Sequence, residues 1–399
     1  MQIIVISNGR AEDLVGAALA RALQAQELER GWRLQVMALP LLGAGDAYRE
    51  AGIGLPLGAG LELPSAGFGR LGLMALWRDL KAGLWSHTLR WVGRLACALV
   101  GTSGKATSGL VCVGDTYLLF LAWLASRQSH RRLPVYFLPT AKSELLRGHG
   151  RAEYWLMRQF TRHVFPRDRA TEAALVRRQV RATYVGNPLL EVGGVAEGWR
   201  RRQERLGADS RDGGEFTVGL LPGSRQDSRE NLEKLLAVAR TIMTLQPDGG
   251  CHFLVGLAKS GGNSAGRSSV VPEGVEVVDF PELLARADLV IGLAGSAHEQ
   301  AAALGIPVIA FPGGRLQYTA RFARAQKRLL GQALVLCPDS PEAVARAAIA
   351  LRHDPDRRAR MAAAGRERMG DPDSRALVAI ARAIAADLAA GPVQDLARS

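Results

Sequence analysis

The sequence predicts an α/β protein with two doubly wound domains, each built on a parallel sheet. Short apolar runs alternate with helical stretches along the chain, as in sheets whose strands are buried on both faces. The series of runs stops near residue 187 and restarts near residue 216. The chain has 399 residues, of which 48% are hydrophobic and 22% are charged, and this is enough for two separate cores.

The first half of the chain contains six short apolar runs that we interpret as strands. Residues 3–7 form the first run, which ends at Asn8-Gly9 and precedes a helix in which Val15, Leu19 and Leu23 share one face. The later runs are residues 34–39, 110–113, 135–138, 163–165 and 183–185. We expect residues 1–190 to form the first domain.

The second half repeats this alternation, with apolar runs at residues 216–220, 252–255, 275–278, 289–291 and 308–310. Residues 191–214 are rich in Arg, Gly and Asp and are expected to be a linker, whereas residues 258–272 are expected to be a surface loop. We expect residues 215–372 to form the second domain and residues 373–399 to add a helix that crosses back onto the first. Because open α/β sheets bind ligands beyond the carboxyl ends of their strands, the two domains are expected to face a cleft.

Positive charge is concentrated in the first half. The net charge is +13; residues 1–190 contain 24 Lys and Arg against 13 Asp and Glu, and residues 191–399 contain 27 against 25. A basic domain suits nucleic acid, an anionic membrane or an anionic substrate, and an Arg-rich composition without function is the alternative. The Arg-rich segments have few aromatic residues and no recognised module, which argues against nucleic acid.

The sequence disfavours several classes of protein. No stretch has the roughly 18–20 uninterrupted apolar residues of a membrane-spanning helix, and the first residues lack the pattern of a signal peptide. Four scattered cysteines form no CxxC pair, so we interpret them as reduced core thiols: Cys97, Cys112, Cys251 and Cys337. We expect a cytoplasmic protein with no metal site and no cofactor.

Three segments of the second half suit a nucleotide ligand. Residues 220–225 (LLPGSR) indicate a strand, a glycine turn and a helix start. Backbone N–H groups and Arg225 can hold a phosphate there. The alternative is a plain turn with a solvated arginine. Residues 292–301 (GLAGSAHEQA) place a loop of small residues before a helix. Glu299 would then lie in the first turn, where it can accept bonds from two ribose hydroxyls or only cap the helix. Residues 311–318 (FPGGRLQY) add Gln317, which can meet sugar hydroxyls.

These segments, in this order and spacing, resemble the donor half of GT-B glycosyltransferases, and more closely lipid-A-disaccharide synthase and a related branch. Residues 184–189 (YVGNPL) and Phe165-Pro166 are similar to further segments of that family. Ser7-Asn8-Gly9 with Glu12-Asp13 resembles the opening of the related branch, although it departs from the AGExSGD of the synthase, and Arg10-Ala11 replaces the expected His-Gly. The resemblance covers most of the chain and is least over residues 40–105.

The resemblance implies two Rossmann-like domains of the GT-B architecture and a UDP-sugar donor bound by the second. The residues implied in donor binding are Gly223, Ser224, Arg225, Gly295, Ser296, Glu299, Gln300 and Gln317. The resemblance also implies a glycine-rich turn in the cleft of the first domain, formed by Ser7, Asn8, Gly9, Glu12 and Asp13.

Asp115 matches the catalytic carboxylate of the family, because it follows a strand of the first domain in the segment Cys112-Val113-Gly114-Asp115. An inverting, metal-independent transfer needs one base near the acceptor hydroxyl. The alternative role of Asp115 is to N-cap the helix that begins at Thr116, in which case Glu12 and Asp13 are further candidates for the base. The lone histidines His149 and His298 are expected to be structural or solvated.

Residues 64–100 combine apolar, aromatic and basic side chains. A helical apolar stripe is formed by Leu73, Trp77, Leu80, Leu84 and Val92, and Trp85 and Trp91 add aromatic rings. Helices of this kind lie in the membrane interface, and a core-facing helix pair with a basic solvent side is the alternative. The expected membrane-facing residues are Trp77, Arg78, Lys81, Trp85, Arg90 and Arg94.

The sequence and the resemblance together predict a hexosyltransferase. We expect it to move a sugar of the N-acetylglucosamine type from a UDP-sugar to a lipid-linked acceptor at the inner face of the plasma membrane. A non-hydrolysing UDP-N-acetylglucosamine 2-epimerase, which shares the fold and donor site, is one alternative. A non-catalytic protein that binds nucleotide sugars or anionic surfaces is another, which the altered opening permits.

Overall fold

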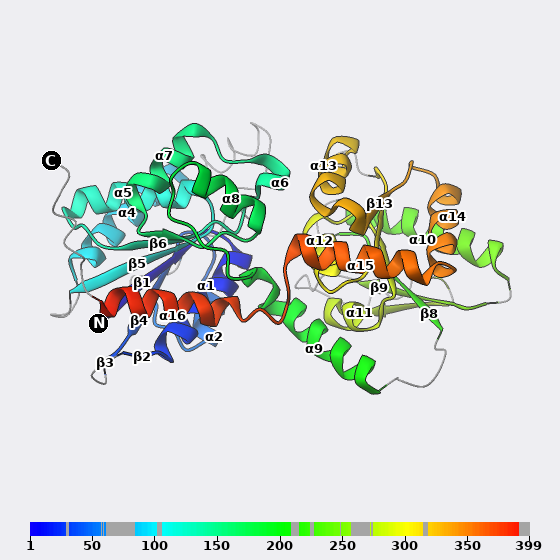
Figure 1. Cartoon of the computed structure of the whole chain (residues 1–399), viewed down its shortest axis with the longest axis horizontal. Coiled ribbons are helices and arrows are strands. Elements are labelled where there is room, and N and C mark those ends of the chain that lie inside the picture. The colour runs from blue at the N-terminus through cyan, green and yellow to red at the C-terminus, as the bar shows by residue number, and fades with distance from the viewer. Residues whose placement is uncertain are drawn as a thin grey trace. The chain divides into compact units, whose positions relative to one another are not determined.

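The computed structural model describes residues 1–28, 32–56, 58, 60, 84–101, 106–208, 215–223, 227–247, 249–256, 272, 274–313 and 318–390. The chain divides into two compact units (Figure 1). Unit 1 consists of Met1–Val192 together with Arg375–Ser399, and unit 2 consists of Gly193–Ser374. Each unit is built on a parallel sheet with helices on both faces.

The sheet of unit 1 has the strand order β4-β1-β5-β6-β7, and all neighbouring strands are parallel. The strands are β1 (Gln2–Ser7), β4 (Gln35–Pro40), β5 (Thr107–Val113), β6 (Val135–Leu138) and β7 (His163–Val164). All residues of β1 and β6 are buried, and so are the last five residues of β5. This burial explains the unbroken apolar runs in the sequence. A small antiparallel pair, β2 (Glu27–Leu28) and β3 (Trp32–Arg33), stands apart from this sheet.

Two helical layers cover this sheet (Figure 1). One core cluster lies under α4 (Leu84–Val100), α5 (Thr116–Ser129) and α7 (Arg151–Phe160). The other lies under α1 (Arg10–Gln24), α2 (Asp46–Glu50) and α16 (Ala376–Ala389). Two further helices and a 3-10 turn complete the unit: α6 (Glu144–Arg147), α8 (Arg169–Arg177) and Pro188–Leu190.

Helix α16 belongs to unit 1 although it is the last helix in the described part of the chain. It packs against α1, and Figure 1 shows it, in red, within unit 1. Ile380 and Ile384 are fully buried in the core that α16 shares with β1 and α1. The Glu191 carboxylate accepts hydrogen bonds from the first N–H groups of α16, at Ala376 and Leu377. The C-terminal helix therefore returns to the N-terminal unit.

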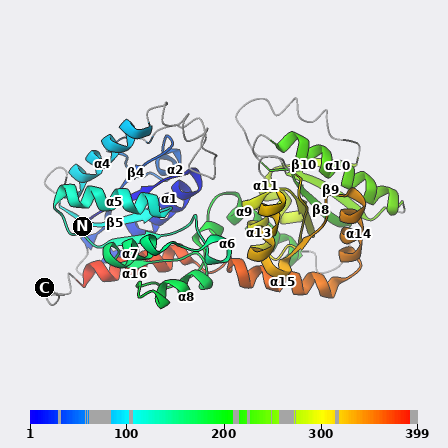
Figure 2. The ribbon, with the colours of Figure 1, turned by 90° about the horizontal axis from the view of Figure 1, so that it is seen from above.

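The sheet of unit 2 has the parallel order β10-β9-β8-β11-β12-β13. Its strands are β8 (Phe216–Leu221), β9 (Cys251–Gly256), β10 (Val275–Val278), β11 (Leu289–Gly292), β12 (Val308–Ala310) and β13 (Leu334–Leu336). Its helices are α9 (Gly193–Ala208), α10 (Ser228–Leu245), α11 (Phe280–Arg286), α12 (Gly295–Ala303), α13 (Ala320–Leu330), α14 (Pro341–Arg352) and α15 (Pro355–Met369), with a 3-10 turn at Gly331–Ala333. Helix α10 packs beside α14 (Figure 2).

The structure corrects four local expectations. The expected linker contains helix α9, which packs against α11. The expected strand at residues 183–185 is absent, since only Ala182 makes an isolated bridge, to Val164. Strand β13 was not predicted. Not all cysteines are core thiols, because Cys97 is exposed and Cys251 is half-buried; all four are free. The expected loop at residues 258–272 lies outside the described residues except for residue 272.

Candidate functional site

Polar residues collect at the carboxyl edge of the unit 1 sheet, where the ends of its parallel strands meet. Ser7 ends β1 and is followed by Asn8, and Asp115 follows β5 after a single glycine. Thr140 follows β6, and Arg167 lies three residues beyond β7. The topology therefore brings side chains from four strand ends to the edge at which open α/β sheets bind ligands.

Asp115 joins two of these strand ends. Its Oδ1 accepts a hydrogen bond from Leu118 N at 3.0 Å, which makes Asp115 the N-cap of α5, and a second from Asn8 Nδ2 at 2.8 Å. Burial raises the pKa of the Asp115 carboxyl, whereas the hydrogen bonds that it accepts and the charge of Lys142 act in the opposite direction. Because a raised pKa makes a carboxylate a stronger base, capping and proton abstraction are compatible roles.

Gly114 allows the contact between Asn8 and Asp115. Its φ is +151°, a conformation that residues with a side chain rarely adopt. A Cβ atom at this position would overlap Asn8 Oδ1. The close approach of the segments that follow β1 and β5 therefore requires glycine here.

Glu12 is a second carboxylate at this edge. It lies in the first turn of α1, and Thr140 Oγ1 donates a hydrogen bond to its Oε1 at 3.5 Å. Burial is the main cause that raises the pKa of Glu12, and the negative charge of Asp115 raises it further, while Arg167 lowers it. A Cβ on Gly9 would lie 2.5 Å from Glu12 Oε2, so Gly9 leaves the space that this carboxylate occupies.

Asp13 belongs to a buried hydrogen-bond chain behind this edge. Its side chain is 5% exposed and accepts a hydrogen bond from Ser7 Oγ at 2.6 Å, and Tyr48 OH in α2 donates to Ser7 Oγ at 2.8 Å. Burial raises the pKa of Asp13 to about 7, the bond from Ser7 lowers it, and the charges of Glu12 and Asp46 raise it. This chain of hydrogen bonds fixes the Ser7 side chain at the end of β1.

Ionisation of Asp13 should destabilise unit 1 as the pH rises. The pKa of Asp13 is raised from 3.8 to about 7, so the folded protein binds a proton that the unfolded chain releases above about pH 4. The free energy of unfolding should therefore fall from pH 5.5 to pH 8 by about 2 kcal/mol and then level off. Asp13→Asn keeps the oxygen that accepts from Ser7 and should remove this decline.

Urea unfolding of both proteins at the two pH values measures the effect. Glu50→Gln is the matched control, because Glu50 is an exposed carboxylate of helix α2 in the same unit, and this variant should keep the decline. An equal decline in the wild type and in Asp13→Asn would contradict the assignment.

Glycine residues lie at the carboxyl edge of the unit 2 sheet, at or just after the ends of three strands. Gly223 follows β8, Gly292 ends β11 and Gly313 follows β12. Leu293 N donates to Leu221 O at 2.9 Å, which joins the ends of β8 and β11. Gly223 has a φ of +87°, so this turn also requires glycine. Gly292 and Gly313 are buried, whereas Gly223 is half-buried, so the turn after β8 is the one that leaves backbone accessible for the close approach of a phosphate or sugar.

Helix α12 adds polar side chains beside these turns. Gly295 and Ser296 open the helix, and Glu299 and Gln300 follow. Glu299 is the fifth residue of α12 and lies beyond its first turn, so the structure corrects the expected first-turn position and does not support helix capping as its role. Glu299 Oε1 accepts a hydrogen bond from Gln326 Nε2 of α13 at 3.2 Å.

His298 has the structural role that the sequence indicated. Its ring is fully buried, and its Nδ1 lies 3.2 Å from Tyr318 OH. Burial lowers the pKa of His298 to about 3, so the imidazole is neutral at physiological pH. A Cβ on Gly292 would lie 2.6 Å from His298 Nε2, which shows how closely the ring approaches the end of β11.

Comparison with known proteins identifies the fold of the chain. No family model matches the chain. Lipid-A-disaccharide synthase of Prochlorococcus marinus (strain MIT 9313) is 28% identical over 384 residues, which cover 90% of this chain and 92% of that protein. UDP-GlcNAc 2-epimerase from Neisseria meningitidis, solved with UDP-GlcNAc, has a TM-score of 0.59 at 13% identity, covering 97% of this chain and 99% of that one. The glycotransferase of kitacinnamycin has a TM-score of 0.61 at 17% identity, with the same coverage. The chain has a GT-B-like fold.

Several of the predicted donor-binding and membrane-facing residues lie outside the part of the chain that the structure describes. Ser224, Arg225 and Gln317 lie outside the described residues, as do Trp77, Arg78, Lys81 and the side chain of Trp85. Arg90 is exposed on α4 and Arg94 is half-buried there. Trp91, grouped by sequence with the aromatic residues of a membrane face, is instead fully buried and donates a hydrogen bond from Nε1 to Pro40 O at 3.1 Å.

The described residues contain neither a metal-binding cluster nor a membrane-spanning helix. No group of three or more His, Cys, Asp or Glu side chains is arranged there to hold a metal ion. In the same residues, no helix combines the length and apolar character needed to cross a membrane.

Glu299→Ala should weaken the binding of ribonucleotides if Glu299 accepts bonds from the ribose hydroxyls. We expect about tenfold or more loss of UDP affinity, as for a hydrogen bond to a charged group, and a smaller difference between UDP and 2′-deoxy-UDP. Isothermal titration calorimetry measures both. Glu342→Ala is the matched control, since Glu342 lies near the start of α14 in the same unit. A variant that distinguishes the two nucleotides as the wild type does would contradict the assignment.

Proposed function

We propose that this protein transfers a sugar from a UDP-sugar to a lipid-linked acceptor. The observation that carries the proposal is the likeness to lipid-A-disaccharide synthase, which extends over 90% of the chain and so includes both units. The polar carboxyl edges of the two sheets support it, because they supply a carboxylate base in unit 1 and glycine turns with Glu299 in unit 2. The neighbour solved with UDP-GlcNAc supports a nucleotide-sugar ligand of the N-acetylglucosamine type.

In this proposal each unit has its own task. Unit 2 binds the donor: the turn of Gly223, Ser224 and Arg225 holds the diphosphate, and Glu299 reads the ribose. Gly295, Ser296, Gln300 and Gln317 contact the phosphate and the sugar. Unit 1 binds the acceptor, and Asp115 removes the proton of the attacking hydroxyl as the bond to UDP breaks. The transfer is inverting and independent of a metal ion.

Epimerisation is the second candidate, and a specific observation favours it. Glu12 and Asp115 lie close enough for the charge of one to raise the pKa of the other, so unit 1 offers two carboxylates at one edge. A 2-epimerase needs acid–base groups on the sugar itself and no second substrate. The epimerase neighbour has the same fold.

Incubation with UDP-GlcNAc, with and without membrane lipid extract, tests the proposal. A transferase should release UDP and form a glycolipid only when lipid is present. An epimerase should form the 2-epimer of UDP-GlcNAc without lipid. A wide screen of nucleotide sugars that yields binding but no product in either arm would overturn both catalytic candidates in favour of a binding protein.

A lipid acceptor implies contact with a membrane, and we propose that unit 1 docks peripherally on an anionic bilayer. The expected contact lies within residues 64–100. The described surface supports a contact on the side of unit 1 that α4, α5 and α7 cover. These helices carry exposed apolar residues: Leu89 and Val100 on α4, Tyr117 and Phe120 on α5, and Trp155 on α7. Among the described residues of α1, α2 and α16, no large hydrophobic side chain is exposed.

Flotation with liposomes should show binding that requires anionic lipid and weakens with salt, because each basic residue near an anionic surface contributes about 1 kcal/mol. Trp77→Ser with Trp85→Ser, or Arg78→Glu with Lys81→Glu, should reduce it. Arg324→Glu with Arg328→Glu is the control, since it makes the same charge change on the exposed face of α13 in unit 2. Wild-type protein that stays unbound at low salt would exclude the docking and the lipid acceptor.

A further inference from the structure

Unit 2 has buried polar atoms without a hydrogen-bond partner beside the carboxyl edge of its sheet. Within the described chain, three buried side-chain atoms of this unit have no partner: Asn231 Oδ1, His298 Nε2 and Gln326 Oε1. They belong to α10, α12 and α13, the helices that follow β8, β11 and β12. A buried polar atom without a partner destabilises a fold, so its presence in a native structure points to another role of the side chain.

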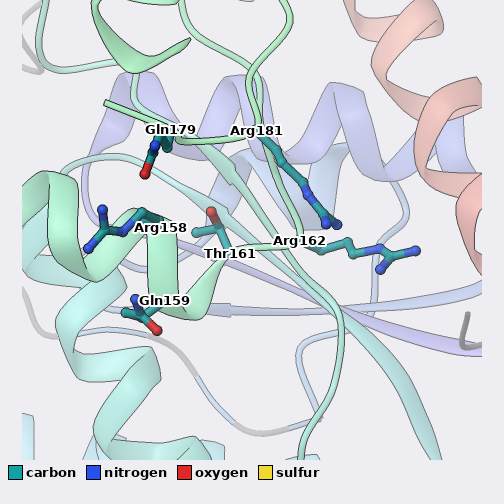
Figure 3. Close-up of a pocket in the computed structure, with 6 residues that line it drawn as sticks. All are labelled: Arg158, Gln159, Thr161, Arg162, Gln179 and Arg181. Carbon is teal, nitrogen blue, oxygen red and sulfur yellow. The ribbon is translucent and has the colours of Figure 1, made fainter. Parts of the chain in front are cut away.

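Exposed amide side chains obtain their hydrogen bonds from water. Gln159 and Gln179 are of this kind, because both are exposed on the wall of a hollow of about 670 Å³ in unit 1 (Figure 3). Gln326 differs from them, because only 1% of its surface is exposed. An amide that is buried to this extent must find its partners within the protein.

Gln326 uses its amide nitrogen for a carboxylate of the neighbouring helix. Its Nε2 on α13 donates a hydrogen bond to Glu299 Oε1 on α12 at 3.2 Å. The opposite orientation of the amide would place its oxygen against the negative carboxylate, so the contact with Glu299 fixes which amide atom faces α12. The Oε1 atom of Gln326 is thereby left buried without a donor.

The packing of α13 on α12 keeps the Gln326 amide in place. Gly295 opens α12, and a Cβ there would lie 2.9 Å from Phe322 Cζ and 3.8 Å from Gln326 Nε2. The Phe322 ring meets the Tyr318 ring edge-on, with centroids 5.4 Å apart. Burial raises the pKa of Tyr318, and the charge of Glu299 raises it further, so this carboxylate lies near the same ring. Gln326 and Glu299 thus meet where α12 and α13 pack closely.

We infer that Gln326 is a positioning residue that holds the Glu299 carboxylate ready for the ribose of the donor. This inference rests on the proposed function, in which Glu299 reads the ribose. A carboxylate has about four acceptor sites, so it can accept from Gln326 and from ribose hydroxyls at the same time. Glu299 is half-buried, and a donor that fixes one of its oxygens reduces the conformational freedom that the side chain loses when the nucleotide binds.

Gln326→Met separates positioning from a structural role. Methionine has a similar length and is apolar, so it fills the same space without the N–H donor and without the unpartnered oxygen. The midpoint of thermal unfolding should therefore be unchanged or higher. The affinity for UDP should fall about three- to tenfold, and the preference for UDP over 2′-deoxy-UDP should shrink at least about twofold. Calorimetry with both nucleotides and thermal unfolding followed by circular dichroism measure these effects.

A double-mutant cycle shows whether Gln326 acts through Glu299. In the Glu299→Ala background, Gln326→Met should cause no further loss of UDP affinity. Gln246→Met is the matched control, because Gln246 ends α10 in the same unit and pairs with Arg352 and His353. This control should lower the unfolding midpoint and leave the affinity for both nucleotides within about twofold, which is the reverse of the pattern for Gln326→Met.

The outcomes distinguish the ribose role of Glu299 from the positioning role of Gln326. Equal affinity of the wild type for UDP and 2′-deoxy-UDP, or a Glu299→Ala variant that still distinguishes them, would overturn the ribose role and this inference with it. If Glu299→Ala loses the distinction and Gln326→Met keeps it, only the positioning role is overturned. A lowered unfolding midpoint of Gln326→Met with unchanged nucleotide binding would leave Gln326 with a structural role alone.

Discussion

Asp115→Asn should reduce turnover by about 10²–10⁴-fold while leaving UDP affinity unchanged, as expected when a general base is lost. Asn retains an Oδ1 that can accept from Leu118 N and Asn8 Nδ2, so the cap of α5 and the link between the two strand ends should persist. The neutral amide cannot take a proton at physiological pH. Rates with saturating donor and calorimetric UDP binding separate the two effects.

The control for Asp115→Asn is Asp354→Asn. Asp354 is also an N-cap, accepting from Arg357 N at 2.8 Å at the start of α15 in unit 2. Its substitution should not change the rate. Full activity of Asp115→Asn would leave Asp115 with the capping role alone, and an equal loss in both variants would assign the effect to stability.

Arg225→Ala should weaken UDP binding by about 1.5–3 kcal/mol, the value typical of a hydrogen bond to a charged group. Arg225 itself lies outside the described residues, and the turn that leads to it begins at Pro222 and Gly223. Gly223 has a φ of +87°, and Asn231 Nδ2 fixes Pro222 O at 3.0 Å. Isothermal titration calorimetry with UDP and with uridine separates a contact to the diphosphate from a contact to the nucleoside.

The control for Arg225→Ala is Arg229→Ala, because Arg229 is exposed in the first turn of α10 and pairs only distantly, at 3.9 Å, with Glu233. UDP affinity should be unchanged in this variant, and uridine affinity should be unchanged in both. If Arg225→Ala binds UDP as the wild type does, the diphosphate is held elsewhere.

The positions of most strands along the chain were predictable because buried parallel strands are unbroken apolar runs, whereas the order of the strands in each sheet was not predicted. Residues 135–138 and 275–278 coincide with β6 and β10. Residues 183–185 have a similar composition, yet Tyr184 N donates to a side chain, Glu172 Oε1, at 2.8 Å, and the Arg169 guanidinium lies over the Tyr184 ring. Its backbone is therefore not available for a strand ladder. Strand β13 is only three residues long and directly follows the 3-10 turn Gly331–Ala333.

Helix α9 was missed because its arginines resemble the composition of a linker. In the structure they bind the carbonyls at the end of α11: Arg202 Nη1 donates to Ala287 O at 2.8 Å, and Arg205 Nη1 donates to Arg286 O at 2.7 Å. Burial lowers the pKa of Arg202 to about 10, which shows how far this side chain is removed from water. Composition alone cannot distinguish arginines that cap a neighbouring helix from solvated ones.

Sequence reasoning found the carboxylates of the candidate site but not their partners. Asp115, Glu12 and Asp13 follow strands or open helices, and those positions are visible in the sequence. Tyr48 and Lys142 reach the site only through tertiary contacts, and no local pattern marks them. Thr140 and Arg167 follow the predicted strands at 135–138 and 163–165, so their place after a strand was a usable signal.

The return of α16 to unit 1 affects the order in which the chain can fold during synthesis. Unit 2 is a continuous segment, so all of its strands leave the ribosome before α16 does. Domains fold as units once their segments are available, whereas unit 1 must wait for its last helix. Until then the apolar surface that Ile380, Ile384 and Leu388 cover remains open on the nascent chain. The N-terminal unit, although made first, is therefore the last to be completed.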